Sequence, residues 1–171
     1  MPQQKKKVRI GANPIIWSSD DLPSIGGGTS LATCLEQARR AGIEGMELGH
    51  KFPTDVDGMR AALAPYGLAF ISGWWSLNLL THSAEAEIEA LQPRLALLKG
   101  MGCKVCIACE TSNAIHSDFD KPLSERPVLS EHEWTTFTQR LTAVAEYLQS
   151  EGIDLVYHHH MGTIVQSRED I

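Results

Sequence analysis

Residues 153–162 read Ile-Asp-Leu-Val-Tyr-His-His-His-Met-Gly, and this stretch decides the fold expected for the 171-residue chain. An apolar run that follows a glycine and ends in histidines predicts a strand buried along its body. Successive side chains of a strand point to opposite faces, so His158 and His160 should share one face. Two such imidazoles could reach one metal ion or one substrate, because histidine is the commonest metal ligand. The alternative is a pair of strand-end histidines that bond to the backbone.

Four more strands are predicted upstream of this one. The first begins at Val8 and ends near Asn13, and the others cover residues 43–50, 68–76 and 103–110. Helical patterns separate the strands, and a glycine ends each pattern just before the next strand, as is typical of helix C-termini. These glycines are Gly42, Gly67, Gly102 and Gly152. Strands that alternate with helices indicate βαβ units and a parallel sheet.

The predicted helices also carry recognisable N-caps, because Ser, Thr and Asp side chains accept bonds from the first turn. Candidate caps are Thr29 or Ser30, Thr54 or Asp55, and Ser83. Ser130 and Glu133 have the spacing of a capping box for the last helix. Pro93 lies inside the third helical pattern and predicts a kink or a break there.

The predicted strands start with apolar residues and end with polar or reactive ones. Their ends carry Asn13; Glu47, His50 and Lys51; Trp75 and Ser76; Glu110 and Thr111; His158 and His160. This distribution predicts a TIM barrel, whose site lies at the carboxyl ends of its strands. A doubly wound sheet also binds ligands there, but the first turn lacks its glycine fingerprint.

Five strands and four helices are fewer than a complete (β/α)8 barrel of roughly 250 residues contains. We therefore expect an incomplete TIM barrel, with residues 1–7 a disordered tail and residues 8–171 the N-terminal part of the barrel. The chain would be a fragment of a longer protein, or a truncated product that covers its open sheet edges by forming a homo-oligomer.

Composition excludes several classes of function. A net charge of −6 argues against nucleic acid as a partner, since phosphate binding favours a basic surface. No run of about 18 apolar residues predicts a membrane span, and no apolar segment follows the N-terminal lysines as in a signal peptide. A cytoplasmic protein with reduced thiols is expected.

Cys103, Cys106 and Cys109 have the spacing of a metal-binding motif. Because side chains alternate between the two faces of a strand, the three thiols cannot converge, and buried apolar roles are favoured.

Glu110, His50 and Lys51 are the candidate catalytic residues. A carboxylate at a barrel mouth can act as acid, base or ligand, although it can also simply pair with backbone or lysine. Lysine can donate a proton or stabilise an enolate, and histidine can move a proton. Candidate substrate-binding residues are Asn13, Trp17 and Trp75. Of the adjacent Trp74 and Trp75, one should pack inward and the other outward, while His82, His116 and His132 are expected to be solvated.

Several of these segments together resemble the inosose dehydratase family. They are residues 13–17 (Asn-Pro-Ile-Ile-Trp), 47–53 (Glu-Leu-Gly-His-Lys-Phe-Pro), 72–76 (Ser-Gly-Trp-Trp-Ser), 122–127 (Pro-Leu-Ser-Glu-Arg-Pro) and 157–163 (Tyr-His-His-His-Met-Gly-Thr). The resemblance implies a xylose-isomerase-like TIM barrel that removes water from a keto-inositol (scyllo-inosose, 2-keto-myo-inositol) in myo-inositol catabolism. It also implies a divalent ion such as manganese or cobalt. A glutamate closes the fifth strand and binds metal in the wider superfamily, and His158 takes that place here.

The leading hypothesis is therefore a lyase that acts on a small polyol or keto-sugar. A metal held in part by His158 and His160 would polarise the ketone. Glu110 or His50 would take the proton next to the carbonyl, and Lys51 or a histidine would protonate the departing hydroxyl. The alternatives are a metal-dependent sugar isomerase or epimerase on the same fold, and an inactive fragment or assembly subunit.

Overall fold

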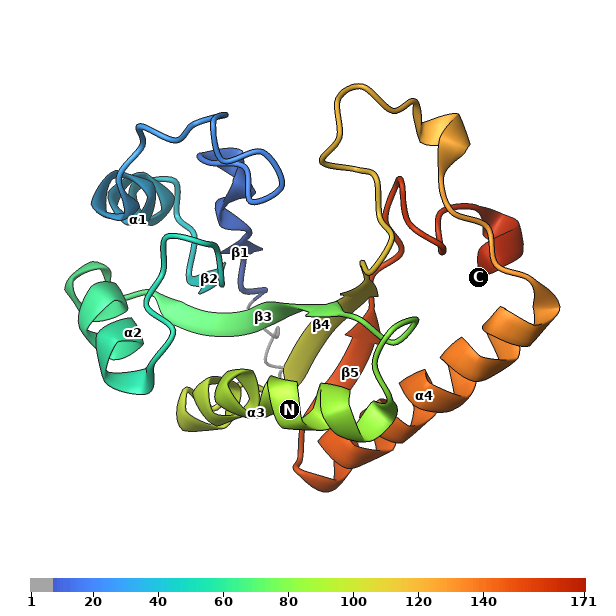
Figure 1. The fold of residues 1–171 in the computed structure, drawn as a ribbon. Coiled ribbons are helices and arrows are strands. Elements are labelled where there is room, and N and C mark those ends of the chain that lie inside the picture. Colours follow the sequence, from blue (N-terminus) through green and yellow to red (C-terminus); the bar gives the residue numbers. More distant parts are fainter. Residues whose placement is uncertain (1–7) are drawn as a thin grey trace, which may run out of the picture. The chain divides into compact units, whose positions relative to one another are not determined.

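Parallel strands and helices alternate along the chain in the computed structural model, which describes residues 8–171 (Figure 1). The strands are β1 (Gly11–Ala12), β2 (Gly45–Glu47), β3 (Ala69–Leu77), β4 (Val105–Glu110) and β5 (Asp154–Tyr157). Their order in the sheet is the order of the sequence. The parallel five-stranded sheet is confirmed; the tail predicted at residues 1–7 lies outside the described residues.

Four α-helices connect the strands, as the glycine and cap pattern predicted. They are α1 (Leu31–Arg40), α2 (Val56–Leu63), α3 (Ala84–Gly100) and α4 (Glu131–Ser150). Short 3-10 turns add Pro14–Ile16, Ala64–Tyr66, Leu123–Glu125 and Arg168–Asp170. Each β-strand and the helix after it form one βα step, which is the unit of a barrel.

The caps predicted from sequence are present. Ser30, Asp55 and Ser83 accept bonds from the first turns of α1, α2 and α3. The glycines that precede β2, β3, β4 and β5 have φ values of +62° to +83°, a region that residues with a Cβ rarely adopt. The predicted break at Pro93 is wrong, because α3 runs through it. Pro93 is exposed, and buried leucines on both sides hold the helix in place.

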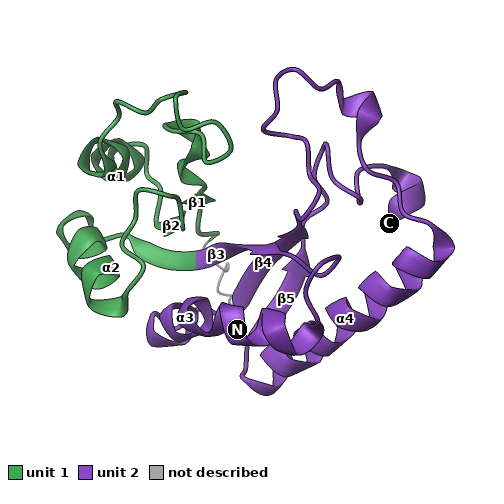
Figure 2. Ribbon diagram, in the orientation of Figure 1, with its two compact units in different colours: residues 1–71 green, residues 72–171 purple. Residues whose placement is uncertain are grey.

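The chain forms two compact units, residues 1–71 and 72–171, and the boundary lies within β3 (Figure 2). The first unit contains β1, β2, the start of β3, α1 and α2. Its core is made of side chains from α1, β2 and α2: Leu35, Ala38, Met46, Met59 and Leu63. The spacing of the α1 members follows the helical period that predicted this helix.

In the second unit, α3 and α4 lie on the same side of β4 and β5 (Figure 1). Gly73 in β3 shows which face α3 covers, because a Cβ there would meet Arg94 and Leu98 of α3 at 3.5 Å. Gly73 pairs with Cys106 of β4, so Cys106 and Ala108 share this helix-covered face. Both are fully buried.

The opposite face of these strands is open. Trp74 and Ser76 lie on it, with Ile107 as the β4 partner of Trp74. Val156 of β5 pairs with Ile107 and is 47% exposed. His158 comes two residues after Val156, so its side chain is expected on the same face. Its backbone N–H donates to Ala108 O at 2.8 Å, which extends the pairing of β5 with β4. This open face therefore leads directly to the histidine-rich end of β5.

A capping box begins α4 and offers a test of the local structure. Ser130 Oγ accepts from Glu133 N–H at 3.4 Å, and Glu133 Oε2 accepts from Ser130 N–H at 2.8 Å. We expect Ser130→Ala to lower the free energy of unfolding by about 1 kcal/mol, measured by urea denaturation. Gln139→Ala, on the exposed surface of the same helix, is the control and should change it by less than about 0.5 kcal/mol. Equal effects of the two substitutions would contradict the role of the cap.

Candidate functional site

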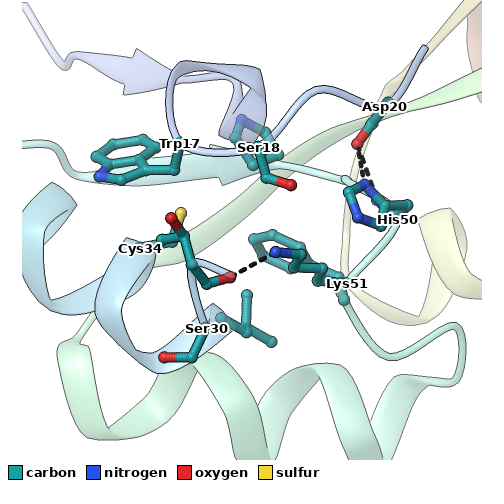
Figure 3. A pocket seen from close by; sticks show the side chains of 11 residues that line it. Trp17, Ser18, Asp20, Ser30, Cys34, His50 and Lys51 are labelled. Carbon is teal, nitrogen blue, oxygen red and sulfur yellow. Dashed lines mark hydrogen bonds and ion pairs between the residues drawn. The ribbon is translucent and has the colours of Figure 1, made fainter. Parts of the chain in front are cut away.

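The first unit has a narrow pocket beside the ends of β1 and β2 (Figure 3). Its eleven lining residues are Pro14, Trp17, Ser18, Asp20, Thr29, Ser30, Leu31, Cys34, His50, Lys51 and Phe52. Three of the residues predicted from sequence, Trp17, His50 and Lys51, therefore lie together. The cavity volume is about 10 Å³, which is room for one water-sized group.

Lys51 holds the loop that covers this pocket. Its Nζ donates to the carbonyl oxygens of Gly26, Gly27 and Thr29 at 3.2, 2.9 and 2.5 Å. An ammonium has three N–H donors, so these bonds can use all of them. To donate a proton to a substrate, Lys51 would first have to release a carbonyl.

His50 has a different environment at the mouth of the pocket. Its Nδ1 lies 2.6 Å from Asp20 Oδ1, and the same oxygen accepts from the His50 backbone N–H at 3.2 Å (Figure 3). The His50 side chain remains about one-third exposed. The imidazole is thus oriented by a carboxylate while part of the ring stays open to solvent.

Asn13 and Trp17 are held by polar partners in the same unit. Asn13 Nδ2 donates to Glu47 Oε2 at 2.7 Å, which ties the end of β1 to the end of β2. Trp17 Nε1 donates to Gln37 Oε1 of α1 at 2.7 Å. These bonds fix the orientation of both side chains.

A separate aromatic cluster lies at the carboxyl ends of the strands in the second unit. The rings of His158 and His160 have centroids 5.8 Å apart, and Trp74 contacts them edge-on at 5.4 and 6.2 Å. His116 from the loop after β4 packs against His160 at 4.7 Å. His159 lines a groove beside α4 with Trp134 and Phe137, and its ring also stacks with that of His158 at 6.1 Å.

The loop after β5 fixes His160 in this cluster. His160 Nδ1 lies 2.9 Å from Met161 O, and a carbonyl only accepts, so Nδ1 carries the proton and Nε2 is the acceptor in the neutral ring. Gly162, at φ +72°, approaches the backbone of His116 so closely that a Cβ would lie 2.8 Å from His116 N. Only glycine fits this position, because both the backbone conformation and the contact exclude a side chain.

Trp75 points away from this cluster, toward α3. Its Nε1 donates to Oε1 of the fully buried Glu87 at 2.7 Å. Glu87 Oε2 also accepts from Asn78 N–H at 3.1 Å and lies 3.3 Å from His82 Nδ1. The structure thus places Trp74, and not the predicted Trp75, beside the histidines, and gives His82 a carboxylate partner.

Glu110 ends β4 as predicted, but its side chain is fully buried. Its Oε2 accepts from Leu79 N–H at 2.6 Å, and its Oε1 accepts from the N–H and hydroxyl of Ser112. Burial raises the pKa of Glu110 above its usual range, and the bonds from Ser112 and Leu79 partly offset this. Glu110 comes two residues after Ala108 in β4, so both side chains belong to the helix-covered face. Trp74 and His158 lie on the other face.

The cysteines are buried thiols. Burial raises the pKa of Cys34, Cys103 and Cys106 to about 11, so these thiols stay protonated at neutral pH. Within residues 8–171, no group of three or more His, Cys, Asp or Glu side chains is arranged to hold a metal ion. The paired rings of His158 and His160, expected to hold part of a metal site, therefore stay a prediction.

Three residues of these sites were missed in the sequence analysis. Asp20 lies in a polar loop with no motif, His116 was expected to be solvated, and Trp74 was not distinguished from Trp75. For Trp74 alone there was a sequence signal: it follows Gly73 directly in the strand, so the two residues lie on opposite faces.

Several solved structures share the fold of this chain. A solved xylose isomerase-like TIM barrel protein from Mycobacterium smegmatis, in complex with magnesium, superposes with a TM-score of 0.66 at 16% identity, covering 95% of this chain and 58% of that one. A probable 3-DHS dehydratase from Bacillus anthracis gives 0.63 at 14%, covering 95% and 56%. An L-ribulose 3-epimerase gives 0.59 at 19%, covering 90% and 50%. The chain therefore has the fold of the first five strands and four helices of a xylose-isomerase-like barrel.

Sequence similarity narrows this class. The chain is 40% identical to the rhizopine catabolism protein MocC of Rhizobium meliloti, over 96% of this chain and 50% of that protein. It is 35% identical to the inosose dehydratase of Geobacillus thermodenitrificans, over 98% and 57%, and 34% identical to that of Clostridium perfringens, over 96% and 56%. The resemblance to inosose dehydratases is therefore confirmed.

The chain spans about half the length of the curated relatives it matches. No family model matches it. Among the described helices, none is long and apolar enough to cross a membrane.

Adjacent tryptophans allow a matched test of the two faces of β3. Trp75→Phe removes the donor to buried Glu87 and should lower the free energy of unfolding by about 1.5–3 kcal/mol, because the carboxylate loses a charge-assisted bond. Trp74→Phe removes the bond to Ser76 at 3.0 Å and reduces the edge contacts with His158 and His160, all on the open face, and should cost less than about 1 kcal/mol. Urea denaturation measures both. The reverse order would contradict the assignment of faces.

Glu110 makes stability depend on pH. Since burial raises its pKa above 4.5, the folded protein binds the Glu110 proton more tightly than the unfolded chain does. The contribution of Glu110 to the free energy of unfolding should therefore fall as pH rises above about 4.5, by at most about 1.4 kcal/mol per pH unit. Urea denaturation between pH 4.5 and 7 should show a more negative slope for wild type than for Glu110→Gln. Parallel slopes would contradict this protonation linkage.

Proposed function

We propose that this chain contributes to a metal-assisted hydro-lyase that removes water from a keto-inositol such as scyllo-inosose, in myo-inositol catabolism. Similarity to inosose dehydratases over almost the whole chain is the observation that carries this proposal. The paired imidazoles at the end of β5 and the carboxylate-oriented histidine at the first-unit pocket support it chemically.

Elimination of water next to a ketone needs three groups. A base takes the acidic proton beside the carbonyl, a positive group stabilises the enolate, and an acid protonates the hydroxyl as it leaves, because hydroxide is a poor leaving group. The described residues include a candidate for each of these roles.

His158 and His160 are our candidates for holding the divalent ion, for which we propose manganese or cobalt. When bound, such an ion acts as a Lewis acid that polarises the ketone. His160 Nδ1 donates to Met161 O, and a hydrogen bond of this kind behind the metal is usual for metal-binding histidines. Trp74 and His116 pack against the two rings and limit their rotation.

His50 is the favoured base of the two predicted ones. Its ring is partly exposed beside a pocket, whereas Glu110 is fully buried and both of its oxygens already accept bonds. We therefore assign Glu110 to anchoring the loop after β3. Lys51 remains a candidate acid, and it becomes available when the loop that contains Gly26 and Gly27 releases one carbonyl.

The substrate in this proposal is a small polyol or keto-sugar. Asn13 and Trp17 of the first unit are its proposed contacts. In the second unit, Trp74 takes the place expected for Trp75 as the aromatic residue beside the histidines. The proposal also includes a cytoplasmic location and assembly with further copies of the chain.

The function is tested with the full chain, scyllo-inosose and either manganese or cobalt. We expect loss of one water from the substrate and a rise in ultraviolet absorbance from the conjugated product. The double variant His158→Ala, His160→Ala should lose bound metal and reduce turnover at least about 100-fold. His132→Ala, in the exposed first turn of α4, is the control and should keep both.

The other outcomes separate the alternatives. A product of unchanged mass would support an epimerase or isomerase. A folded chain with neither bound metal nor turnover would support an inactive fragment or assembly subunit. Metal content and turnover that survive the double histidine substitution would overturn the assignment of the metal site.

A further inference from the structure

The strongest feature that the sequence did not indicate is the contact between Asp20 and His50. Asp20 Oδ1 lies 2.6 Å from His50 Nδ1 and also accepts from the His50 backbone N–H at 3.2 Å. Both groups belong to the first unit, thirty residues apart in sequence. The carboxylate therefore fixes both the backbone and the ring of His50.

This contact determines which ring nitrogen carries the proton. An ionised carboxylate only accepts hydrogen bonds, so Nδ1 of His50 must be the donor. In the neutral imidazole the lone pair is then on Nε2, which is free to act as a base. A carboxylate that holds a histidine in one tautomer has the same role in hydrolase triads, where it also stabilises the imidazolium that forms.

A second observation indicates that a polar group binds in the same pocket. Ser18 is 6% exposed, and its hydroxyl is buried without a hydrogen-bond partner among the described residues. A buried hydroxyl without a partner is unfavourable, so a ligand group that bonds to it gains affinity. The cavity beside it has room for one water-sized group, which is the size of a single hydroxyl. Figure 3 shows Ser18 on the pocket wall, between Trp17 and His50 in this view.

We propose that Asp20 is the positioning residue of His50, and that the Ser18 hydroxyl binds one hydroxyl group of a polyol substrate beside this pair. This inference rests on the proposed function in that His50 is the base. His50 Nε2 takes the proton from the carbon next to the ketone, and the electron pair of that C–H bond forms the enolate. Asp20 stabilises the resulting imidazolium, which later returns the proton to solvent.

A purely structural role for Asp20 makes a different prediction. Asp20 would then only tie its loop to the backbone at His50, and its removal would lower stability without selecting a tautomer. The test therefore needs a measurement on the ring itself. Nitrogen-15 NMR of the imidazole side chains gives the position of the proton, and the signals of His50 are assigned from their loss in His50→Gln.

In the wild-type chain we expect neutral His50 to carry its proton on Nδ1. Asp20→Ala removes the acceptor and should shift the proton to Nε2 in most molecules. Asp20→Asn keeps an acceptor oxygen and the loop contact, and should give a mixture, so it remains informative if Asp20→Ala does not fold. Asp21→Asn is the matched control, because this neighbouring carboxylate does not line the pocket.

Turnover of scyllo-inosose supplies the second readout. Asp20→Ala should lower kcat at least about 100-fold with little change in KM, because the positioning residue affects proton transfer rather than binding. Ser18→Ala should instead weaken binding of scyllo-inosose by about 3- to 10-fold, the effect of one lost hydrogen bond. Since the Ser18 hydroxyl has no partner to lose within residues 8–171, the melting temperature should not fall.

The proposal is overturned if wild-type His50 carries its proton on Nε2, or if Asp20→Ala folds and keeps it on Nδ1. The subsite is overturned if Ser18→Ala binds scyllo-inosose as tightly as wild type. Failure of the proposed function looks different: the tautomer responds to Asp20 as expected, but the wild-type chain neither binds nor converts the keto-inositol.

Discussion

Alternation of side chains across parallel strands is the constraint on which the rest of this structure depends. One face of β3, β4 and β5 is covered by helices, and the other is open. Because residues in register share a face, Gly73 and Cys106 face the helices, whereas Trp74 and Ile107 face the open side. A shift of one residue would exchange the two sets and bury the histidine-rich end of β5 under α4.

The loops that follow the strands are held by charged side chains whose partners are mostly backbone groups. In the first unit, Lys51 binds three carbonyls and Asp20 binds the backbone of His50. In the second unit, Arg140 donates to Leu79 O at 2.6 Å while Glu110 accepts from Leu79 N–H. Removing such charges from water is costly, so each is retained with strong bonds. The benefit is that these loops are preorganised.

This preorganisation explains why two of the predicted catalytic residues are less available for chemistry than the histidines. Glu110 and Lys51 are both ionisable groups at strand ends, yet their bonds to the backbone occupy them in the observed structure. His50 and His160 are also bonded, but in each of these contacts the ring nitrogen involved is Nδ1, so the neutral ring carries its lone pair on Nε2. The imidazole can serve structure and chemistry together because its two nitrogens are distinct. The proposed lyase chemistry therefore depends most on histidines.

The sequence by itself determined the order of the elements. Caps at Ser30, Asp55, Ser83 and Ser130 depend on local hydrogen bonds, and the glycines that end the helices depend on local backbone angles, so both can be read without a tertiary structure. The alternation in residues 153–162 likewise predicted that His158 and His160 lie together. The break expected at Pro93 does not occur, because tertiary packing of buried leucines holds α3 together there.

Only the tertiary structure decided which strand-end residues are available for chemistry. The roles of Trp74 and Trp75 depend on which face α3 covers, and the role of Glu110 depends on a bond to a loop thirty-one residues earlier. Asp20 reaches His50 through a loop that has no periodic pattern. Such contacts join segments that are distant in sequence, and no local propensity encodes them. Side-chain type and spacing thus predicted the fold, and long-range packing assigned the chemistry.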